Sequence, residues 1–158
     1  MKVLSWNCRG LGSKHKEEVM KDMFRLSQPD IVLIHETKME KEAFLQVSEK
    51  LWNKGGCLTV SLRGAFGEIG TLWDVQKFEL IESKQSLHWI LTKLLHKDSN
   101  TQVSLFNIYS PALYAGKKDC WNLLSNERSN GSLDNVILAN DLNVALNHSE
   151  EKKRRISG

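Results

Sequence analysis

A chain of 158 residues has the length of one domain and is long enough to bury a sizeable core. Hydrophobic residues make up 41% and charged residues 26%, an ordinary globular balance, and the net charge of +3 permits a polyanionic partner without demanding one. The three cysteines are far apart and form no Cys-x-x-Cys pair, which argues against a zinc site and favours a reducing compartment. No apolar stretch approaches the about 20 residues of a membrane helix, so we expect a soluble, intracellular protein without a membrane partner.

The first third of the chain alternates between strand and helix patterns. We expect a strand over residues 2–6, a glycine-bearing loop over 9–13, and a helix over 14–26 with its apolar residues on one face. The uninterrupted Ile-Val-Leu-Ile run at 31–34 predicts a strand that is covered on both faces. A second helix is expected over residues 41–51.

After Gly55-Gly56 the pattern changes to short strands separated by turn residues, which predicts a meander. These strands are expected over residues 57–60, 70–73, 78–82, 87–92 and 102–108. A helix over 117–124, a loop rich in Ser, Asn and Gly, and a strand over 136–139 follow. No repeat, linker or low-complexity segment interrupts the pattern, so the chain is interpreted as one α/β unit.

Four of the predicted strands end in polar side chains with complementary chemistry. Asn7, Glu36 and Tyr109 each follow a strand, and Asp141 and Asn143 follow the last one. Each of them alone is typical of a turn, a solvated charge or a packing residue. Ligand sites in α/β sheets, however, lie beyond the carboxyl ends of strands. We therefore expect these five residues to share a site.

The chemistry of this set is rich in oxygen: two carboxylates, two amides and a phenol, with no cluster of thiolates or histidines. Such a set favours a hard cation, Mg²⁺ or Mn²⁺. A metal held by a carboxylate and an amide can polarise a phosphoryl oxygen. An aspartate beside an amide can take a proton from water, and a tyrosine hydroxyl can donate to a phosphate. The set therefore suggests phosphodiester hydrolysis.

Five short motifs occur in an order that is found in a known family. They are SWNCRGLG at 5–12, IHETK at 34–38, GTLWD at 70–74, NIYSP at 107–111 and NDLNV at 140–144. The chain resembles the endonuclease/exonuclease/phosphatase superfamily, and within it the apurinic-endonuclease-like domain of plant non-LTR retrotransposons. The resemblance covers the whole chain but only the first part of that domain, so residues 1–158 are expected to form an incomplete domain. It implies part of a four-layer α/β sandwich, with two packed β-sheets flanked by helices.

The resemblance also implies a role for each residue of the predicted site. Asn7 and Glu36 would hold Mg²⁺ or Mn²⁺, with Glu36 as the principal ligand. Tyr109 would contact the phosphate, Asp141 would deprotonate the attacking water, and Asn143 would orient that residue and touch the phosphate. DNA would be the partner, and the nucleus would be the compartment in which chromosomal DNA is reached.

Three departures from the family pattern are visible. Asn140 stands where the family has glycine, and Asn is the mildest replacement because it enters the left-handed region readily. His35 stands where the family has Gln, and we interpret it as a structural residue beside the site. The family's closing Ser-Asp-His motif does not occur in the sequence. Because one positioned acid-base group contributes about 10²–10⁴ in rate, we expect a DNA-nicking endonuclease that is impaired or inactive.

Other interpretations stay open at this stage. A phosphatase is the alternative within the same fold. A non-catalytic fragment that binds nucleic acid or a protein, through an open sheet and the basic residues 152–155, is the alternative from another class. Those basic residues are also compatible with a solvated tail, and a reading frame without a selected function remains a further alternative. The sequence does not indicate the oligomeric state.

Overall fold

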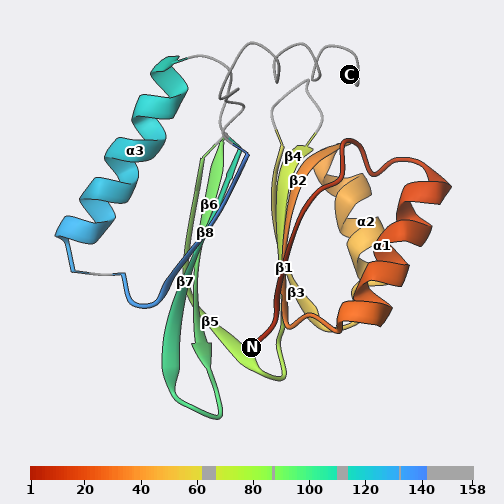
Figure 1. Cartoon of the computed structure of the whole chain (residues 1–158), viewed down its shortest axis with the longest axis horizontal. Helices are drawn as coiled ribbons and strands as arrows, with labels where there is room; N and C mark the ends of the chain where they lie inside the picture. The colour runs from red at the N-terminus through yellow and green to blue at the C-terminus, as the bar shows by residue number, and fades with distance from the viewer. Residues whose placement is uncertain (62–66, 87, 110–113, 132, 142–158) are drawn as a thin grey trace.

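The computed structural model describes residues 1–61, 67–86, 88–109, 114–131 and 133–141. Within these residues, two four-stranded β-sheets pack face to face and helices cover both outer faces (Figure 1). The four layers confirm the α/β sandwich that the resemblance implied. No helix in the described ranges is long and apolar enough to cross a membrane.

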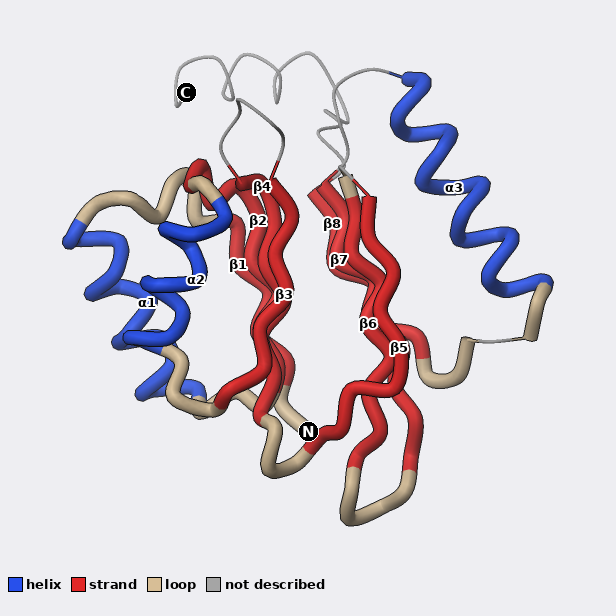
Figure 2. Tube along the Cα trace, turned by 180° about the vertical axis from the view of Figure 1, so that it is seen from behind, coloured by secondary structure: helices blue, strands red, loops and turns tan. Residues whose placement is uncertain are grey.

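The first sheet, sheet A, has the strand order β1-β2-β4-β3. Its strands are β1 (Val3–Asn7), β2 (Ile31–Met39), β3 (Gly55–Ser61) and β4 (Gly67–Asp74). Strands β1 and β2 run parallel, and β4 pairs antiparallel with both β2 and β3. Two helices, α1 (Lys14–Ser27) and α2 (Lys41–Leu51), cover the outer face of sheet A, as the reverse view also shows (Figure 2).

The second sheet, sheet B, has the order β5-β6-β7-β8. Its strands are β5 (Phe78–Ser86), β6 (Trp89–His96), β7 (Thr101–Tyr109) and β8 (Val136–Asp141). The last two run parallel and the other pairs are antiparallel. One helix, α3 (Tyr114–Ser129), lies over the outer face of sheet B, where its Leu123 and Leu124 pack against Leu91, Phe106 and Ile108.

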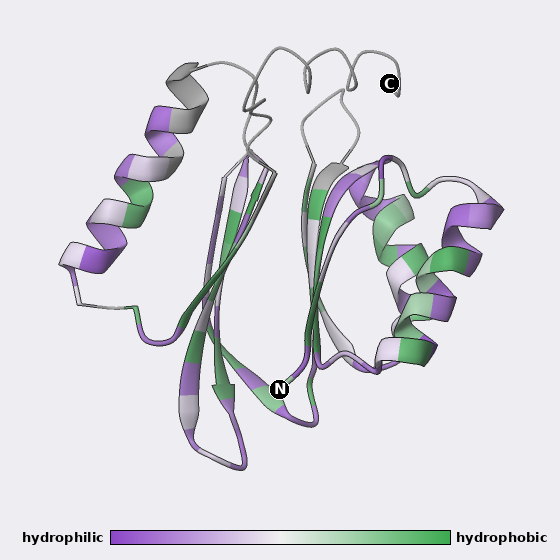
Figure 3. Cartoon of the chain, viewed as in Figure 1, coloured by the Kyte–Doolittle hydropathy of each residue, from purple (hydrophilic) through white to green (hydrophobic). Residues whose placement is uncertain are grey.

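Strand β2 shows why this sequence forms a layered core. Its alternate residues point to opposite faces, so Val32 and Ile34 pack under the helices while Ile31 and Leu33 pack against sheet B. All four are fully buried, which confirms the prediction of a strand covered on both faces. Figure 3 shows the same distribution, with hydrophobic residues along the strands and polar residues at the hairpin between β6 and β7.

The structure corrects the sequence-based boundaries in three places. The strand at 31–34 continues to Met39, so Glu36 lies inside β2 and does not follow it. The predicted meander is divided between the sheets, because β3 and β4 join sheet A while β5, β6 and β7 form the meander of sheet B. Helix α3 spans residues 114–129, so it begins before the predicted helix and takes in the first part of the segment that was expected to be a loop.

Helix α3 is also held by buried charges. Glu127 of α3 and Lys93 of β6 are 6% and 5% exposed, and both belong to one cluster of ion pairs. Lys84 Nζ lies 2.7 Å from Glu127 Oε1, and Lys93 Nζ lies 2.7 Å from Glu82 Oε2. The cluster compensates the charge of each buried group, which is the condition for burying it.

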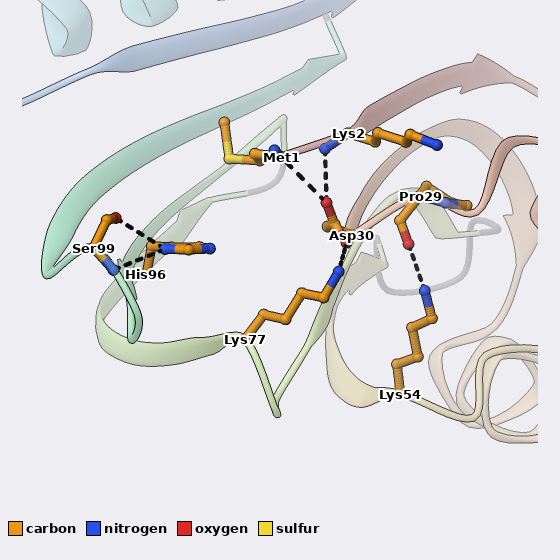
Figure 4. Close-up of polar contacts among 8 residues, drawn as sticks. All are labelled: Met1, Lys2, Pro29, Asp30, Lys54, Lys77, His96 and Ser99. Atoms are coloured by element: carbon orange, nitrogen blue, oxygen red, sulfur yellow. Dashed lines mark hydrogen bonds and ion pairs between the residues drawn. The ribbon is translucent and has the colours of Figure 1, made fainter.

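The amino-terminal edge of β2 is fixed by Asp30 (Figure 4). Its carboxylate accepts a hydrogen bond of 2.8 Å from the backbone amide of Lys2 and one of 2.5 Å from Lys77 Nζ. Burial by itself would raise the pKa of Asp30. The hydrogen bonds from Lys77 and Lys2, together with the charges of Lys77 and the terminal amine, outweigh that effect and hold the pKa below its usual value. Asp30 therefore stabilises the fold as a carboxylate.

Asp30→Asn is expected to lower the free energy of unfolding at pH 7 by about 1.5–3 kcal/mol, because hydrogen bonds to a charged group are lost. Since the folded-state pKa of Asp30 is lowered, its contribution is present above the ordinary pKa of 3.8 and disappears as the pH falls below it. Urea unfolding of both proteins between pH 2.5 and 7 measures this. The exposed Asp22, paired with Arg25 at 3.5 Å, gives the control Asp22→Asn, which should unfold like the wild type. A stability difference between Asp30→Asn and the wild type that persists unchanged at pH 2.5 contradicts the assignment.

Candidate active site

The carboxyl ends of β1, β2, β7 and β8 lie at the same end of the two sheets (Figure 1). The first two form a parallel pair in sheet A, and the last two form a parallel pair in sheet B. Each pair delivers its final residues to one edge. In the register of sheet A, Asn7 lies opposite His35, and in that of sheet B, Tyr109 lies opposite Asp141. The candidate site therefore draws its residues from both sheets.

Asn7 and Glu36 are in direct contact. Asn7 Nδ2 donates a hydrogen bond of 3.2 Å to Glu36 Oε1. The other end of the amide, Oδ1, accepts a hydrogen bond of 3.1 Å from the backbone amide of Arg9. Both side chains are half-buried. Asn7 thus orients the carboxylate and also closes the turn that follows β1.

The loop after β1 continues along β2 beyond the last pair of the parallel ladder. Cys8 N donates to the His35 carbonyl at 3.0 Å, and Gly10 N donates to the Glu36 carbonyl at 2.7 Å. Leu11 is fully buried, and its amide donates to the Thr37 carbonyl at 2.9 Å. These bonds fix the position of the loop, and with it Asn7, relative to Glu36.

The backbone at this edge is unusual. Arg9, Glu36 and Lys38 have φ angles of +48°, +53° and +50°, and they are three of the six described non-glycine residues with positive φ. Such a conformation costs about 1–3 kcal/mol per residue and gathers at functional sites. The pairing of β2 with β4 also shifts register between His35 and Met39, as in a β-bulge. Bulges of this kind re-aim side chains next to active sites, and here the side chain is that of Glu36.

A buried thiol supports the same segment from below. Cys8 Sγ donates to the carbonyl oxygens of His35 and Glu36, at 3.2 Å and 3.3 Å. Burial raises the pKa of Cys8 to about 11, and backbone hydrogen bonds and the charge of Lys16 offset only part of that rise. The thiol is therefore neutral at pH 7 and able to donate. His35 itself is 3% exposed, and its interpretation as a structural residue stays a prediction.

The end of β7 contributes Tyr109 of sheet B to the candidate site. Tyr109 is half-buried and packs against the cluster of Val60, Ile69 and Ile90, which spans both sheets. Its backbone amide donates to the His88 carbonyl at 2.8 Å. The phenol ring is thus carried at the place where the two sheets meet.

Sequence reasoning did not assign a role to Asn107, two residues earlier. This side chain is fully buried, and its Nδ2 donates to the Gly70 carbonyl at 2.8 Å and to Thr71 Oγ1 at 3.2 Å. It joins sheet B to sheet A directly behind the site. The available signal was an amide in the middle of the otherwise apolar run Leu105 to Ile108, where an unpaired amide would be unfavourable.

The structure describes the remaining predicted site residues only in part. The backbone of Asp141 pairs with Tyr109, and that of Asn140 pairs with Ile108, but their side chains lie outside the part that the structure describes. Asn143 and the basic residues 152–155 lie outside the described residues altogether. The structure thus brings Asn7 and Glu36 together and places the Asp141 backbone beside Tyr109.

The donors at this edge fit a hard cation. Glu36 forms no ion pair with any described lysine or arginine, so its charge is not neutralised there. Mg²⁺ takes one or two protein oxygens and keeps waters or phosphate oxygens at its other positions. No three His, Cys, Asp or Glu side chains converge within the described ranges, so a cation here would depend on a small protein donor set.

Comparison with solved structures identifies the fold, whereas comparison of sequences finds no match. No protein-family model matches the sequence, and no curated protein sequence matches it. A solved structure of an endonuclease/exonuclease/phosphatase family protein from Bacteroides thetaiotaomicron superposes with a TM-score of 0.74. The match covers 100% of this chain and 69% of that one, at 16% identity. The fold is that of the endonuclease/exonuclease/phosphatase proteins.

Other proteins with this fold differ in what they act on or bind. A mannosyl-6-phosphatase from the same bacterium matches with a TM-score of 0.73 and 15% identity, over 96% of this chain and 68% of that one. D. rerio TDP2 complexed with a single-strand DNA product matches with a TM-score of 0.68 and 15% identity, over 92% of this chain. The chain spans 61% of that TDP2 structure and 63% of a humanized one. At such low identities, it is the TM-scores that show a shared fold.

Proposed function

We propose that this chain is a Mg²⁺-dependent phosphodiesterase that nicks DNA, of the apurinic-endonuclease-like kind found in plant non-LTR retrotransposons. The observation that carries the proposal is the 3.2 Å hydrogen bond between Asn7 Nδ2 and Glu36 Oε1 at the carboxyl ends of parallel strands. It presents an oriented carboxylate, not paired with any described cation, where α/β folds bind ligands. Glu36 and Asn7 would hold a Mg²⁺ ion, which would supply a Lewis acid for a phosphoryl oxygen.

The other steps belong to residues at the end of sheet B. Asp141 accepts a proton from the attacking water, whose oxygen bonds to phosphorus as the bond to the leaving sugar oxygen breaks. Asn143 orients Asp141, and the Tyr109 hydroxyl donates to the phosphate as charge develops on it. The register that sets Tyr109 beside Asp141 supports this division of roles. Because the sequence has no Ser-Asp-His motif, we expect a rate about 10²–10⁴ below that of a chain that has one.

Supercoiled plasmid tests the proposal. Incubation of the purified monomeric chain with Mg²⁺ is expected to give slow conversion to the relaxed circle, and EDTA should abolish it. Asp141→Ala should abolish it too, whereas Asp134→Ala, at an exposed carboxylate on the approach to β8, should not. Nicking that survives Asp141→Ala, or a folded sample that never nicks, would speak against the proposed function.

A phosphatase is the second candidate, favoured by the TM-score of 0.73 with the mannosyl-6-phosphatase. Release of inorganic phosphate from a hexose 6-phosphate, measured beside nicking under the same conditions, separates the two. Phosphate release without nicking supports the phosphatase. DNA binding that falls with salt, with neither activity and no effect of Asp141→Ala beyond its charge, supports a non-catalytic nucleic-acid-binding fragment.

A further inference from the structure

A cavity of about 590 Å³ opens between helix α2 and the first residues of strand β3. Its volume is within the range of pockets that take small organic molecules. Through β4 this part of β3 aligns with the amino end of β2, because Cys57 pairs with Leu72 and Leu72 pairs with Val32. The cavity therefore lies away from Glu36 and the candidate active site. We call it the α2–β3 pocket, and the side chains that line it are Leu45, Ser48, Glu49, Trp52, Asn53 and Cys57.

The buried side chains of the pocket carry no charge. Ser48 is 3% exposed, its hydroxyl donates to the Leu45 carbonyl at 2.9 Å, and the same oxygen lies 3.5 Å from Cys57 Sγ. Burial raises the pKa of Cys57, and the hydrogen bond with Ser48 offsets only part of that rise. The thiol is therefore neutral at pH 7 and behaves as a small apolar group. Together with Leu45 and the buried Trp52 it suits the hydrocarbon part of a ligand.

The exposed part of the pocket is negative. Glu49 is exposed and forms no ion pair with any described residue. The pocket also adjoins the end of α2 at Leu51. The last carbonyl groups of a helix lack a partner within the helix and carry the negative end of its dipole. The carboxylate and the helix end therefore favour a cation at the same opening.

The two lysines that are adjacent in sequence are engaged elsewhere. Lys50 Nζ lies 3.0 Å from Glu17 Oε2 on α1. Lys54 Nζ donates to the Pro29 carbonyl at 2.7 Å and lies over the Trp52 ring, 5.1 Å from its centroid. Neither lysine is among the described residues that line the pocket, so no lining cation offsets its negative potential.

We propose that the α2–β3 pocket binds a small organic ammonium ion, with its cationic group at Glu49 and the end of α2 and its hydrocarbon part against Leu45 and Trp52. A carboxylate and helix carbonyls stabilise such a cation by their charge and by accepting its N–H hydrogen bonds. A phosphate would be repelled at the same place. The ligand class therefore differs from that of the candidate active site, and the assignment is independent of the proposed hydrolysis.

Backbone amide chemical shifts of the ¹⁵N-labelled protein, titrated with benzylammonium, test the site directly. Binding is expected with a dissociation constant of about 1 mM at low salt, with the largest shifts at Asn53 and Cys57. Benzyl alcohol and benzoate, which have the same ring without the positive charge, should bind more weakly. Alkylation of Cys57 by iodoacetamide, followed by mass spectrometry, should slow as benzylammonium is added, because the bound ligand covers the thiol.

Two matched variants on α2 separate the pocket from the general charge of the helix. Glu49→Gln is expected to weaken benzylammonium binding about 5-fold and to leave the binding of benzyl alcohol unchanged. Glu42→Gln removes the same charge at an exposed position in the first turn of α2, outside the pocket, and should bind like the wild type. A loss confined to Glu49→Gln, with protection of Cys57, supports the proposal whether or not plasmid is nicked. Equal losses in the two variants, equal binding of the alcohol and the ammonium, or no shift at 10 mM benzylammonium overturns it.

Discussion

Glu36→Gln is expected to remove the thermal stabilisation that Mg²⁺ or Mn²⁺ gives to this chain. A ligand at 100 times its dissociation constant stabilises the folded state by about 2.7 kcal/mol, which is about 5–10 °C in melting temperature for a domain of this size. Glutamine keeps the shape of Glu36 and an oxygen for the hydrogen bond from Asn7 Nδ2, so the metal-free melting temperature should change little. The carboxylate charge that a hard cation needs is lost.

The measurement is a melting curve of each protein across a series of Mn²⁺ concentrations, with Ca²⁺-free buffer and an EDTA baseline. Glu18→Gln, at an exposed carboxylate on α1, serves as the matched control and should keep the full shift. Asn7→Ala should give a reduced shift, because it removes the amide that orients Glu36 and an oxygen that would hold the metal. A full Mn²⁺ shift in Glu36→Gln would place the cation elsewhere in the molecule.

The layered fold follows from patterns that are local in the sequence. The apolar run at 31–34 predicted a strand buried on both faces, and its alternate residues do pack against the helices and against sheet B. The helix at 41–51 has the predicted limits. These features were predictable because burial imposes a period on each element, and the period is visible within a dozen residues.

The division of the strands between two sheets was not predictable in the same way. Strand β4 inserts between β2 and β3, a long-range choice that the alternation within residues 55–74 does not encode. One specific signal for this choice is Gly70, which pairs with Ile34 on one side and Thr59 on the other and lies under Phe44 of α2. A glycine in a strand often marks a place where another group approaches the backbone closely, but the sequence alone does not identify that group.

The sequence predicted the contact between Asn7 and Glu36 and did not predict the backbone conformation around them. Asn7 and Glu36 meet because the parallel ladder of β1 and β2 ends at the pair Asn7–His35, one residue before Glu36, although β2 itself continues to Met39. The left-handed conformations of Arg9, Glu36 and Lys38 carry no compositional signal, since these residue types rarely adopt them. They depend on the backbone hydrogen bonds from the loop after β1 to β2 and on the register shift between His35 and Met39, which are tertiary features. The roles of Asp141 and Asn143 stay predictions.

Gly70→Ala is expected to destabilise the chain by about 3 kcal/mol or more, a large fraction of the 5–15 kcal/mol that holds a domain of this kind together. A Cβ at position 70 would overlap the Phe44 ring, lying 2.7 Å from Cε1 and closer still to Cζ. Phe44 is fully buried in the core between α2 and sheet A, so the ring has no solvent-side position to move to. The Gly70 carbonyl also accepts the hydrogen bond from Asn107 Nδ2, so a shift of β4 would disturb the contact between the sheets behind the site.

A double-mutant cycle isolates this overlap from other effects of the substitution. Phe44→Leu shortens the ring side chain, so Gly70→Ala should be much less harmful in that background, with a coupling energy of about 1–3 kcal/mol by urea unfolding. Gly12→Ala is the matched control, because a Cβ there meets nothing within 4 Å and its φ is not positive. Its stability should stay equal to or slightly above that of the wild type, since alanine reduces the entropy of the unfolded chain. Additive effects of Gly70→Ala and Phe44→Leu would show that β4 and α2 are not in the close contact on which the position of β2, and therefore of Glu36, depends.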